Sequence, residues 1–295
     1  MIRKSRIDNA ILIVNNAVMA VFLLVVLYPL WVVVVSSISE PSMVAAGKVW
    51  LWPVNLSLQG YQAVFDYELI MTGFYNSLVL MVVGTVITMA VTVLGAYPLS
   101  RRDLAGKKPI QFLFVFTMFF GGGLIPYFIL IKDLKLLDSL WSLILPSTIN
   151  VWNIILMRTY FHSNIPDEIN NAAKIDGCDD FTFLLCIAVP LSTPIIAVLA
   201  LFTAVGYWNS YFSALMFIDD TAKFPLQLVL RDILITNQTD PTTIGQDVLS
   251  LKNKQALIEA LKYSVIVVSS LPLMVLYPFV QKFFVKGMIV GSLKG

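Results

Sequence analysis

The chain has 295 residues, of which 58% are apolar and only 13% are charged, with a formal net charge of +2. A typical soluble domain carries about twice that share of charged residues, so this composition excludes an ordinary soluble domain. The near-neutral net charge gives no indication of a nucleic-acid partner. The charged residues cluster between apolar runs of about twenty residues or more, each long enough to cross a hydrocarbon core about 30 Å thick. The sequence therefore predicts an all-α, polytopic membrane protein.

Six apolar runs are predicted to be transmembrane helices. In chain order they are roughly Ala10–Val35, Thr72–Leu99, Ile110–Ile131, Leu140–Phe161, Phe181–Tyr207 and Ala260–Phe284. The first run follows basic residues, as a secretory signal does, but it is too long for the apolar part of a signal peptide. No small-x-small cleavage site follows it either, so we expect an uncleaved membrane anchor.

The basic residues predict the orientation of these helices. They gather in three segments: Arg3, Lys4 and Arg6 before the first helix, Arg101, Arg102, Lys107 and Lys108 between the second and third, and Lys282, Lys286 and Lys294 around the end of the sixth. Because cytoplasmic loops are enriched in lysine and arginine, both termini are predicted to be cytoplasmic. The facing segments Ser36–Met71 and Trp208–Glu259 are then outer loops.

Polar residues in and beside these helices mark a candidate translocation path, because polar groups that face lipid are costly. Asn150 and Asn153 lie in the fourth helix, and Tyr207, Trp208 and Asn209 stand at the outer end of the fifth. Aromatic rings can stack on sugar faces, while an amide binds hydroxyl groups. Two other interpretations stay open. The aromatic residues also fit the belt at a lipid interface, and the asparagines also fit hydrogen bonds between helices.

The connection between the fourth and fifth helices is long enough to fold by itself. Asn164 is a suitable N-cap, Pro166 falls near the first helical position, and Gly177 supplies the left-handed position that ends a helix. Asp167 and Glu168 fall in the first turn, where the helix dipole favours negative charge. These signals predict a short cytoplasmic helix.

The predicted cytoplasmic helix has a narrow apolar face formed by Ile165, Ile169, Ala172 and Ala173. The adjacent alanines allow close approach by a partner, and the polar face is acidic rather than basic. These features favour docking onto a protein, with a helix lying on lipid headgroups as the alternative. One aspartate of the pair Asp179-Asp180 is expected to cap the helix that follows.

The sequence offers no usable pattern for catalysis or metal binding. A phosphate-binding G-x-x-x-x-G-K-[ST] motif does not occur, since the dipeptide Gly106-Lys107 lacks the required Ser or Thr after it. His162, the only histidine, falls at the cytoplasmic end of the fourth helix, and no acidic residue falls at mid-helix as in a proton-coupled carrier. Cys178 and Cys186 are predicted to be free thiols on the reducing side. We expect no catalytic residue, metal site or cofactor in this chain, so a partner must supply the energy.

The cytoplasmic connection resembles the EAA loop of permeases from binding-protein-dependent ABC importers. The residues that carry this resemblance are Ala172-Ala173-x-x-Asp176-Gly177, followed by Pro190-Leu191. The glutamate that names the motif would fall at Asn171. Whether Glu168, one turn earlier on the same side of the helix, takes its place stays open.

Within that family the chain is most similar to carbohydrate permeases of the maltose-permease MalG type, and especially to the LplC-like subgroup. The segment Phe224–Arg231 and the C-terminal segment Tyr277–Gly295 carry this likeness, which runs from about Thr72 to the C-terminus. It implies the fold of a type I ABC importer permease with six transmembrane helices. Residues 1–71 would hold the first helix and an outer loop, 72–284 the permease domain with its coupling loop at 164–194, and 285–295 a cytoplasmic tail.

The resemblance also implies a complex in the bacterial cytoplasmic (inner) membrane. The implied partners are a second permease subunit, a dimer of ABC ATPase subunits that hold ATP and Mg²⁺, an extracytoplasmic solute-binding protein and an oligosaccharide substrate. ATPase coupling is carried over to Glu168, Ile169, Ala172, Ala173, Asp176 and Gly177. The tail residues Lys286, Gly287 and Gly291 are expected at the ATPase dimer interface, with a frayed terminus as the alternative.

The function that follows is a permease subunit that imports an oligosaccharide by alternating access, driven by a separate ATPase. We expect the outer loop to contact the solute-binding protein around Ile235–Ile244. An ABC permease for a non-sugar solute and a membrane scaffold without a path of its own are the two alternatives. The LplC-like resemblance is also compatible with a substrate oligosaccharide that contains uronate.

Overall fold

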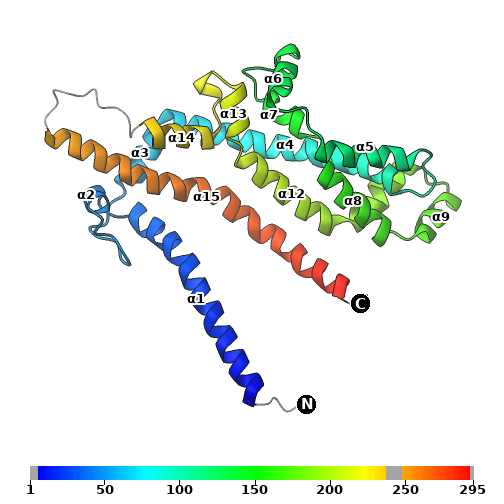
Figure 1. The fold of residues 1–295 in the computed structure, drawn as a ribbon, viewed down its shortest axis with the longest axis horizontal. Coiled ribbons are helices and arrows are strands. Elements are labelled where there is room, and N and C mark those ends of the chain that lie inside the picture. Colours follow the sequence, from blue (N-terminus) through cyan, green and yellow to red (C-terminus); the bar gives the residue numbers. More distant parts are fainter. Residues whose placement is uncertain (1–5, 237–247, 293–295) are drawn as a thin grey trace. The chain divides into compact units, whose positions relative to one another are not determined.

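The computed structural model describes residues 6–236 and 248–292, which are helical apart from loops and one isolated bridge between Ser39 and Leu56 (Figure 1). The prediction of an all-α chain is confirmed. The chain divides into two compact units, Met1–Glu68 with Asp232–Leu271, and Leu69–Arg231 with Pro272–Gly295.

The first unit contains α1 (Arg6–Ser37), α2 (Pro41–Ala45), α3 (Gln59–Asp66) and the first part of α15 (Val248–Ser292). The apolar part of α1 is 6% buried, as suits a helix that faces lipid. α3 packs closely on α15 at Gly60, where an added side chain would meet Ser264. The Ser264 hydroxyl in turn donates to the carbonyl oxygen of Ser37 (3.3 Å), so α15 is joined to the end of α1 as well.

The second unit is built around α4 (Glu68–Ser100), which supplies residues to two hydrophobic clusters. Its other elements are α5 (Lys107–Phe119), α6 (Leu124–Asp133), α7 (Trp141–Ile144), α8 (Val151–Asn164), α9 (Asp167–Ile175), α10 (Asp180–Phe183), a π-helical turn (Leu184–Ala188), α11 (Val189–Leu191), α12 (Thr193–Trp208), α13 (Phe212–Phe217) and the first part of α14 (Leu226–Thr236), with short 3₁₀ turns at Leu145–Ser147 and Thr221–Lys223. One cluster packs the C-terminal part of α4 on α8 and α12, through residues such as Ala96, Met157 and Leu199. The other packs its N-terminal part on α7 and α13, through Leu80 and Phe217.

Three helices in the described residues are long and apolar enough to cross a membrane: Ala10–Ser37, Glu68–Ser100 and Ile258–Phe279. Two further candidates are bent pairs. α5 and α6 meet at 111°, and the segment Asp180–Leu191 meets α12 at 82°. The first bend follows from the glycines before α6, since Gly123 has a φ of +84°, which side chains other than glycine rarely adopt. The predicted third and fifth helices are therefore broken, while the count of six spans and the orientation of the termini stay predictions.

The predicted fourth transmembrane helix, Leu140–Phe161, is not continuous, and that prediction was wrong. α7 runs into the 3₁₀ turn at Leu145–Ser147, and α8 begins only after Asn150. Pro146 stands in the turn and has no N–H for an intrahelical hydrogen bond. The side chain of Asn150 then caps α8 by accepting a hydrogen bond from the backbone N–H of Asn153 (3.1 Å). Apolar composition alone does not show such a break.

α4 and α12 approach closely at Gly84, where an added Cβ would lie 2.6 Å from the Tyr207 ring. Tyr207 is 6% exposed, and its hydroxyl shares a hydrogen bond with Thr88 Oγ1 (2.9 Å) and donates to the carbonyl oxygen of Ile144 (3.3 Å). Small residues allow this close packing between membrane helices. Tyr207 therefore joins α4, α7 and α12.

Replacing Gly84 by Ala should destabilise the protein, because the new methyl group would overlap a ring that two hydrogen bonds hold in place. We expect a loss of about 1–3 kcal/mol in the free energy of unfolding, as in other overpacked cores. The loss is measured from the thermal unfolding midpoint of the purified protein in detergent. Gly206→Ala on α12 is the matched control, since nothing lies within 4 Å of a Cβ there. Equal unfolding midpoints for the two variants would contradict this account of the packing.

Candidate functional site

The helix predicted in the cytoplasmic connection is α9, and its N-cap is Pro166 rather than Asn164. Asn164 is the last residue of α8, and its side-chain amide donates to the carbonyl oxygen of Tyr160 (3.1 Å). Ile165 is extended (φ −111°, ψ 101°), because the residue before a proline is disfavoured in the helical conformation. The prediction of Asn164 as N-cap was therefore wrong.

The C-terminal end of α9 matches its prediction. Gly177 has a φ of +78°, and its N–H donates to the carbonyl oxygen of Lys174 (3.1 Å). The N–H of Cys178 donates to the carbonyl oxygen of Ala173 (2.9 Å). This pair of hydrogen bonds is the Schellman motif that ends many helices. Asp179 then caps α10 by accepting a hydrogen bond from the N–H of Thr182 (3.1 Å), which confirms the expected aspartate cap.

α9 turns only part of its predicted apolar face outward. Ala173 is 8% exposed and belongs to the core of the second unit, and Ile165 packs against the same core. Glu168, Asn171, Ala172, Ile175 and Asp176 are exposed, as is Ile169. The expectation of one continuous docking stripe was thus wrong for Ala173 and Ile165. The outward face holds Ile175, 86% exposed, which was not predicted because on a helical wheel it falls beside the polar residues Glu168 and Asn171.

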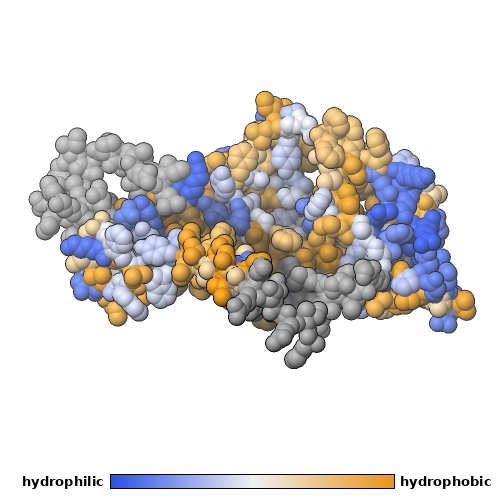
Figure 2. All heavy atoms as spheres, turned by 60° about the horizontal axis from the view of Figure 1, so that its bottom comes forward, coloured by the Kyte–Doolittle hydropathy of each residue, from blue (hydrophilic) through white to orange (hydrophobic). Residues whose placement is uncertain are grey.

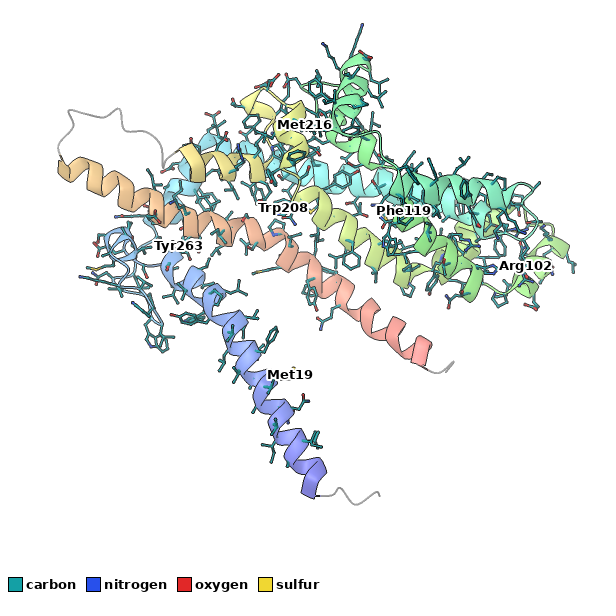
Figure 3. The ribbon with its side chains drawn as sticks, in the orientation of Figure 1. Met19, Arg102, Phe119, Trp208, Met216 and Tyr263 are labelled. Carbon is teal, nitrogen blue, oxygen red and sulfur yellow. The ribbon has the colours of Figure 1, made fainter. Side chains whose placement is uncertain are left out.

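Ion pairs connect α9 to the turn between α4 and α5. Arg102 Nε lies 3.0 Å from a carboxylate oxygen of Asp167, at the start of α9. Lys174 Nζ, at its end, lies 3.5 Å from Asp103. Figure 3 labels Arg102 beside α9, and Figure 2 shows hydrophilic residues gathered at this end of the second unit. From the sequence, Arg102 was predicted only to mark the cytoplasmic side of the membrane.

The partly buried side chain of Arg101 stabilises the turn between α4 and α5. Its side chain is 13% exposed, lies 5.9 Å from the centre of the Tyr97 ring, and makes ion pairs with Asp103 (2.8 Å) and Asp180 (3.7 Å). The hydrogen bonds from Arg101 hold the pKa of Asp103 well below its usual value, with a smaller contribution from Lys174. Asp103 is therefore ionised throughout the neutral range.

A cavity of about 700 Å³ lies between α8, α12 and the start of α13. Its polar wall is made of amide and hydroxyl side chains, among them Thr88, Ser147, Asn150, Asn153, Thr203, Asn209 and Ser210. Its aromatic wall contains Trp152, Phe202, Tyr211 and Phe212, which are all exposed. The residues that line it in the described part of the chain include no Asp, Glu, Lys, Arg or His.

The cavity brings together four of the five residues predicted for the path: Asn150, Asn153, Tyr207 and Asn209. Asn153 is 6% exposed and donates to Thr203 Oγ1 (3.1 Å), which joins α8 to α12. Trp208 is not among the lining residues. It is 1% exposed and packs edge-on against Phe74, with 5.4 Å between ring centroids. Figure 3 labels Trp208 at the end of α12. Trp152, by contrast, was not predicted, because its place in an apolar run looks like ordinary lipid contact.

The predicted C-terminal tail and the predicted contact segment of the outer loop are described only in part. Lys286, Gly287 and Gly291 fall inside α15, which continues to Ser292, and their side chains lie outside the described ones. Of the loop Ile235–Ile244, only the end of α14 is described, since residues 237–247 lie outside the described ranges. Among the described residues no group of His, Cys, Asp or Glu is placed to hold a metal ion.

The helices, the exposed α9 and the uncharged cavity define a multi-pass membrane permease. The chain belongs to the family described as "Binding-protein-dependent transport system inner membrane component", whose model matches residues 104–290. The resemblance that rested on the EAA-like loop and the C-terminal segments is thereby confirmed.

Two relatives in Bacillus subtilis (strain 168) are similar over most of their length. The chain is 42% identical over 277 residues to the polygalacturonan/rhamnogalacturonan transport system permease protein YtcP. This alignment covers 93% of this chain and 94% of YtcP. The chain is 38% identical over 271 residues to protein LplC, and this alignment covers 92% of this chain and 90% of LplC. The structure is similar to a chain in the crystal structure of a bacterial ABC transporter involved in the import of the acidic polysaccharide alginate. That match has a TM-score of 0.87 and 33% identity, and it covers 96% of this chain and 100% of the other.

The lowered pKa of Asp103 makes the attachment of α9 insensitive to mild acid. A carboxyl group whose pKa falls on folding stabilises the fold above its ordinary pKa of 3.8, and this contribution is lost only as the pH falls through the lowered value. We expect amide hydrogen exchange in α9, corrected for intrinsic rates, to be equally slow at pH 5 and pH 7. Asp103→Asn should make hydrogen exchange in α9 faster at both pH values. Faster exchange of the unmodified protein at pH 5 than at pH 7 would contradict this assignment.

Proposed function

We propose that this chain is a permease subunit that moves an oligosaccharide across the bacterial cytoplasmic membrane by alternating access. The observation that carries the proposal is the cavity, which combines amide and hydroxyl groups with exposed aromatic rings in a chain of the permease family. Sugars present hydroxyl groups at their edges and weakly apolar faces, and these two kinds of side chain match both. A scaffold subunit would not need such a cavity.

The absence of charge in the cavity lining suits a transport path. A path must bind its substrate well enough to admit it and weakly enough to release it. Neutral hydrogen-bonding groups meet that condition, whereas a lysine or arginine in a dry cavity would hold an acidic sugar through a strong ion pair. The side chains of Asn153 and Tyr207 already make hydrogen bonds within the protein, so their positions are fixed before substrate enters.

We further propose an oligosaccharide that contains uronate as the substrate class. The support comes from the similar proteins, one named for polygalacturonan and rhamnogalacturonan and the other described for alginate. Uronate carboxylates would accept hydrogen bonds from the amides and hydroxyls of this cavity. A second permease subunit would complete the path.

The energy is proposed to enter through the outward face of α9. A dimer of ABC ATPase subunits, holding ATP and Mg²⁺, would grip Glu168, Ala172 and Ile175. An extracytoplasmic solute-binding protein would deliver the substrate to the opposite side. The sequence has no phosphate-binding loop of its own, which supports a separate source of energy.

Replacing Trp152 by Ala should lower oligosaccharide uptake about three- to tenfold, the loss expected when an aromatic stacking contact is removed. Uptake of a galacturonic acid trisaccharide by vesicles that hold the complete transporter measures it. Trp141→Ala is the matched control, because Trp141 is also an exposed tryptophan but does not line the cavity. Equal uptake by the two variants would show that the cavity is not the path. Uptake of an amino acid instead of any sugar would favour the non-sugar alternative.

Replacing Ile175 by Glu should uncouple ATP hydrolysis from import, because it places a charge on the most exposed apolar residue of the proposed ATPase contact. We expect uptake to fall at least about tenfold, as for a disrupted interface anchor, while the permease still reaches the membrane. Copurification of the ATPase and uptake per ATP hydrolysed are the measurements. Ser163→Glu adds the same charge at the exposed end of α8 and is the control. Normal uptake by the Ile175 variant would exclude α9 as the coupling contact.

A further inference from the structure

We infer that the turn Arg101-Arg102-Asp103 is a positioning site that sets the rotation of α9 about its own axis, and so decides which face α9 presents to the ATPase. This inference rests on the proposed function of α9. The juxtaposition that carries it is the pair of ionic contacts between adjacent residues of this one turn and the two ends of α9.

The two contacts lie on one face of the helix. Asp167 and Lys174 are seven residues apart, about two turns, so their side chains project in nearly the same direction. Ala173 and the half-buried Asn170 lie next to them on the inward side. One contact alone would act as a pivot. Two contacts on the same face, one at each end, resist both rotation and tilting.

The turn itself is tied to the end of α4. Arg101 is nearly buried against the Tyr97 ring, and the Lys107 ammonium group donates to the carbonyl oxygens of Ser100 (3.3 Å) and Arg101 (2.9 Å). Arg158 Nε donates to the carbonyl oxygen of Leu99 (3.3 Å). Cations thus satisfy carbonyl groups that the end of a helix leaves without partners. A movement of α9 is therefore passed to α4 through this turn.

The contacts with α9 are exposed, which suits positioning more than stability. The side chains of Arg102 and Asp167 are 74% and 51% exposed, and those of Lys174 and Asp103 are 48% and 59% exposed. Single ion pairs of this kind add little to stability. Breaking one should leave the protein folded and assembled while changing how α9 is held.

A charge-exchange cycle tests the inference in the complete transporter, with both permease subunits, the ATPase and the solute-binding protein in vesicles. The variants are Arg102→Glu, Asp167→Lys and the double variant that restores an ion pair with its signs exchanged. The readout is galacturonic acid trisaccharide imported per ATP hydrolysed. The Glu259–Lys262 pair (2.7 Å), within the single helix α15, is exchanged in the same way as control, since it joins no two elements.

We expect each single variant to lower the ratio of import to hydrolysis about three- to tenfold, as the pair becomes a repulsion. The double variant should recover most of that loss, while the control exchange should change nothing. A double variant as impaired as the worse single variant, or single variants with a normal ratio, would overturn the inference. The Ile175→Glu variant separates the two hypotheses: if it uncouples while the cycle shows no recovery, α9 is the coupling contact but the turn does not position it.

Discussion

The constraint on which the second unit depends is that no backbone polar group can face lipid without a partner. A long unbroken helix satisfies this condition by itself, as α4 does over Glu68–Ser100. The stretch between α7 and α8 is broken, and its free groups need partners. Asn150 supplies one as the cap of α8, and Ser147 and Asn150 also line the cavity. Irregular backbone at membrane depth is tolerated where it lines such a cavity, so the break and the candidate path occur together.

α4 connects the two candidate sites. Thr88 lines the cavity and bonds to Tyr207, while Ser100, twelve residues or about 18 Å further along the helix axis, ends at the turn that holds α9. Gly84 brings α12 close to α4 at the cavity, and Arg101 fixes the turn against Tyr97. A displacement of α9 therefore has a continuous, packed route to the cavity wall, made of one helix and its close contacts.

Local rules predicted local features well. Gly177 and a cap within the pair Asp179-Asp180 were predicted because a left-handed C-terminal position and an N-cap are set by the residues themselves. One error came from two local signals that compete, and the others came where a distant part of the chain decides. Asn164 has the chemistry of an N-cap, but Pro166 moved the start of the helix. Ala173 has the size for a partner contact, but the permease core occupies that side of α9. The ion pair of Arg102 and Asp167 joins residues 65 positions apart, which no local pattern reveals.

In the proposed function, the uncharged cavity would recognise the substrate and the highly charged end at α9 would receive the drive. Ionic contacts at α9 lie in water, where they are weak singly and can be remade as the helix moves. The same charges placed in the cavity would be desolvated and strong, and would trap an acidic sugar. Neutral amides, hydroxyls and aromatic rings give enough attraction to replace the water around a sugar without stopping its release. The distribution of charge along the second unit thus matches the role that the proposed function gives to each end.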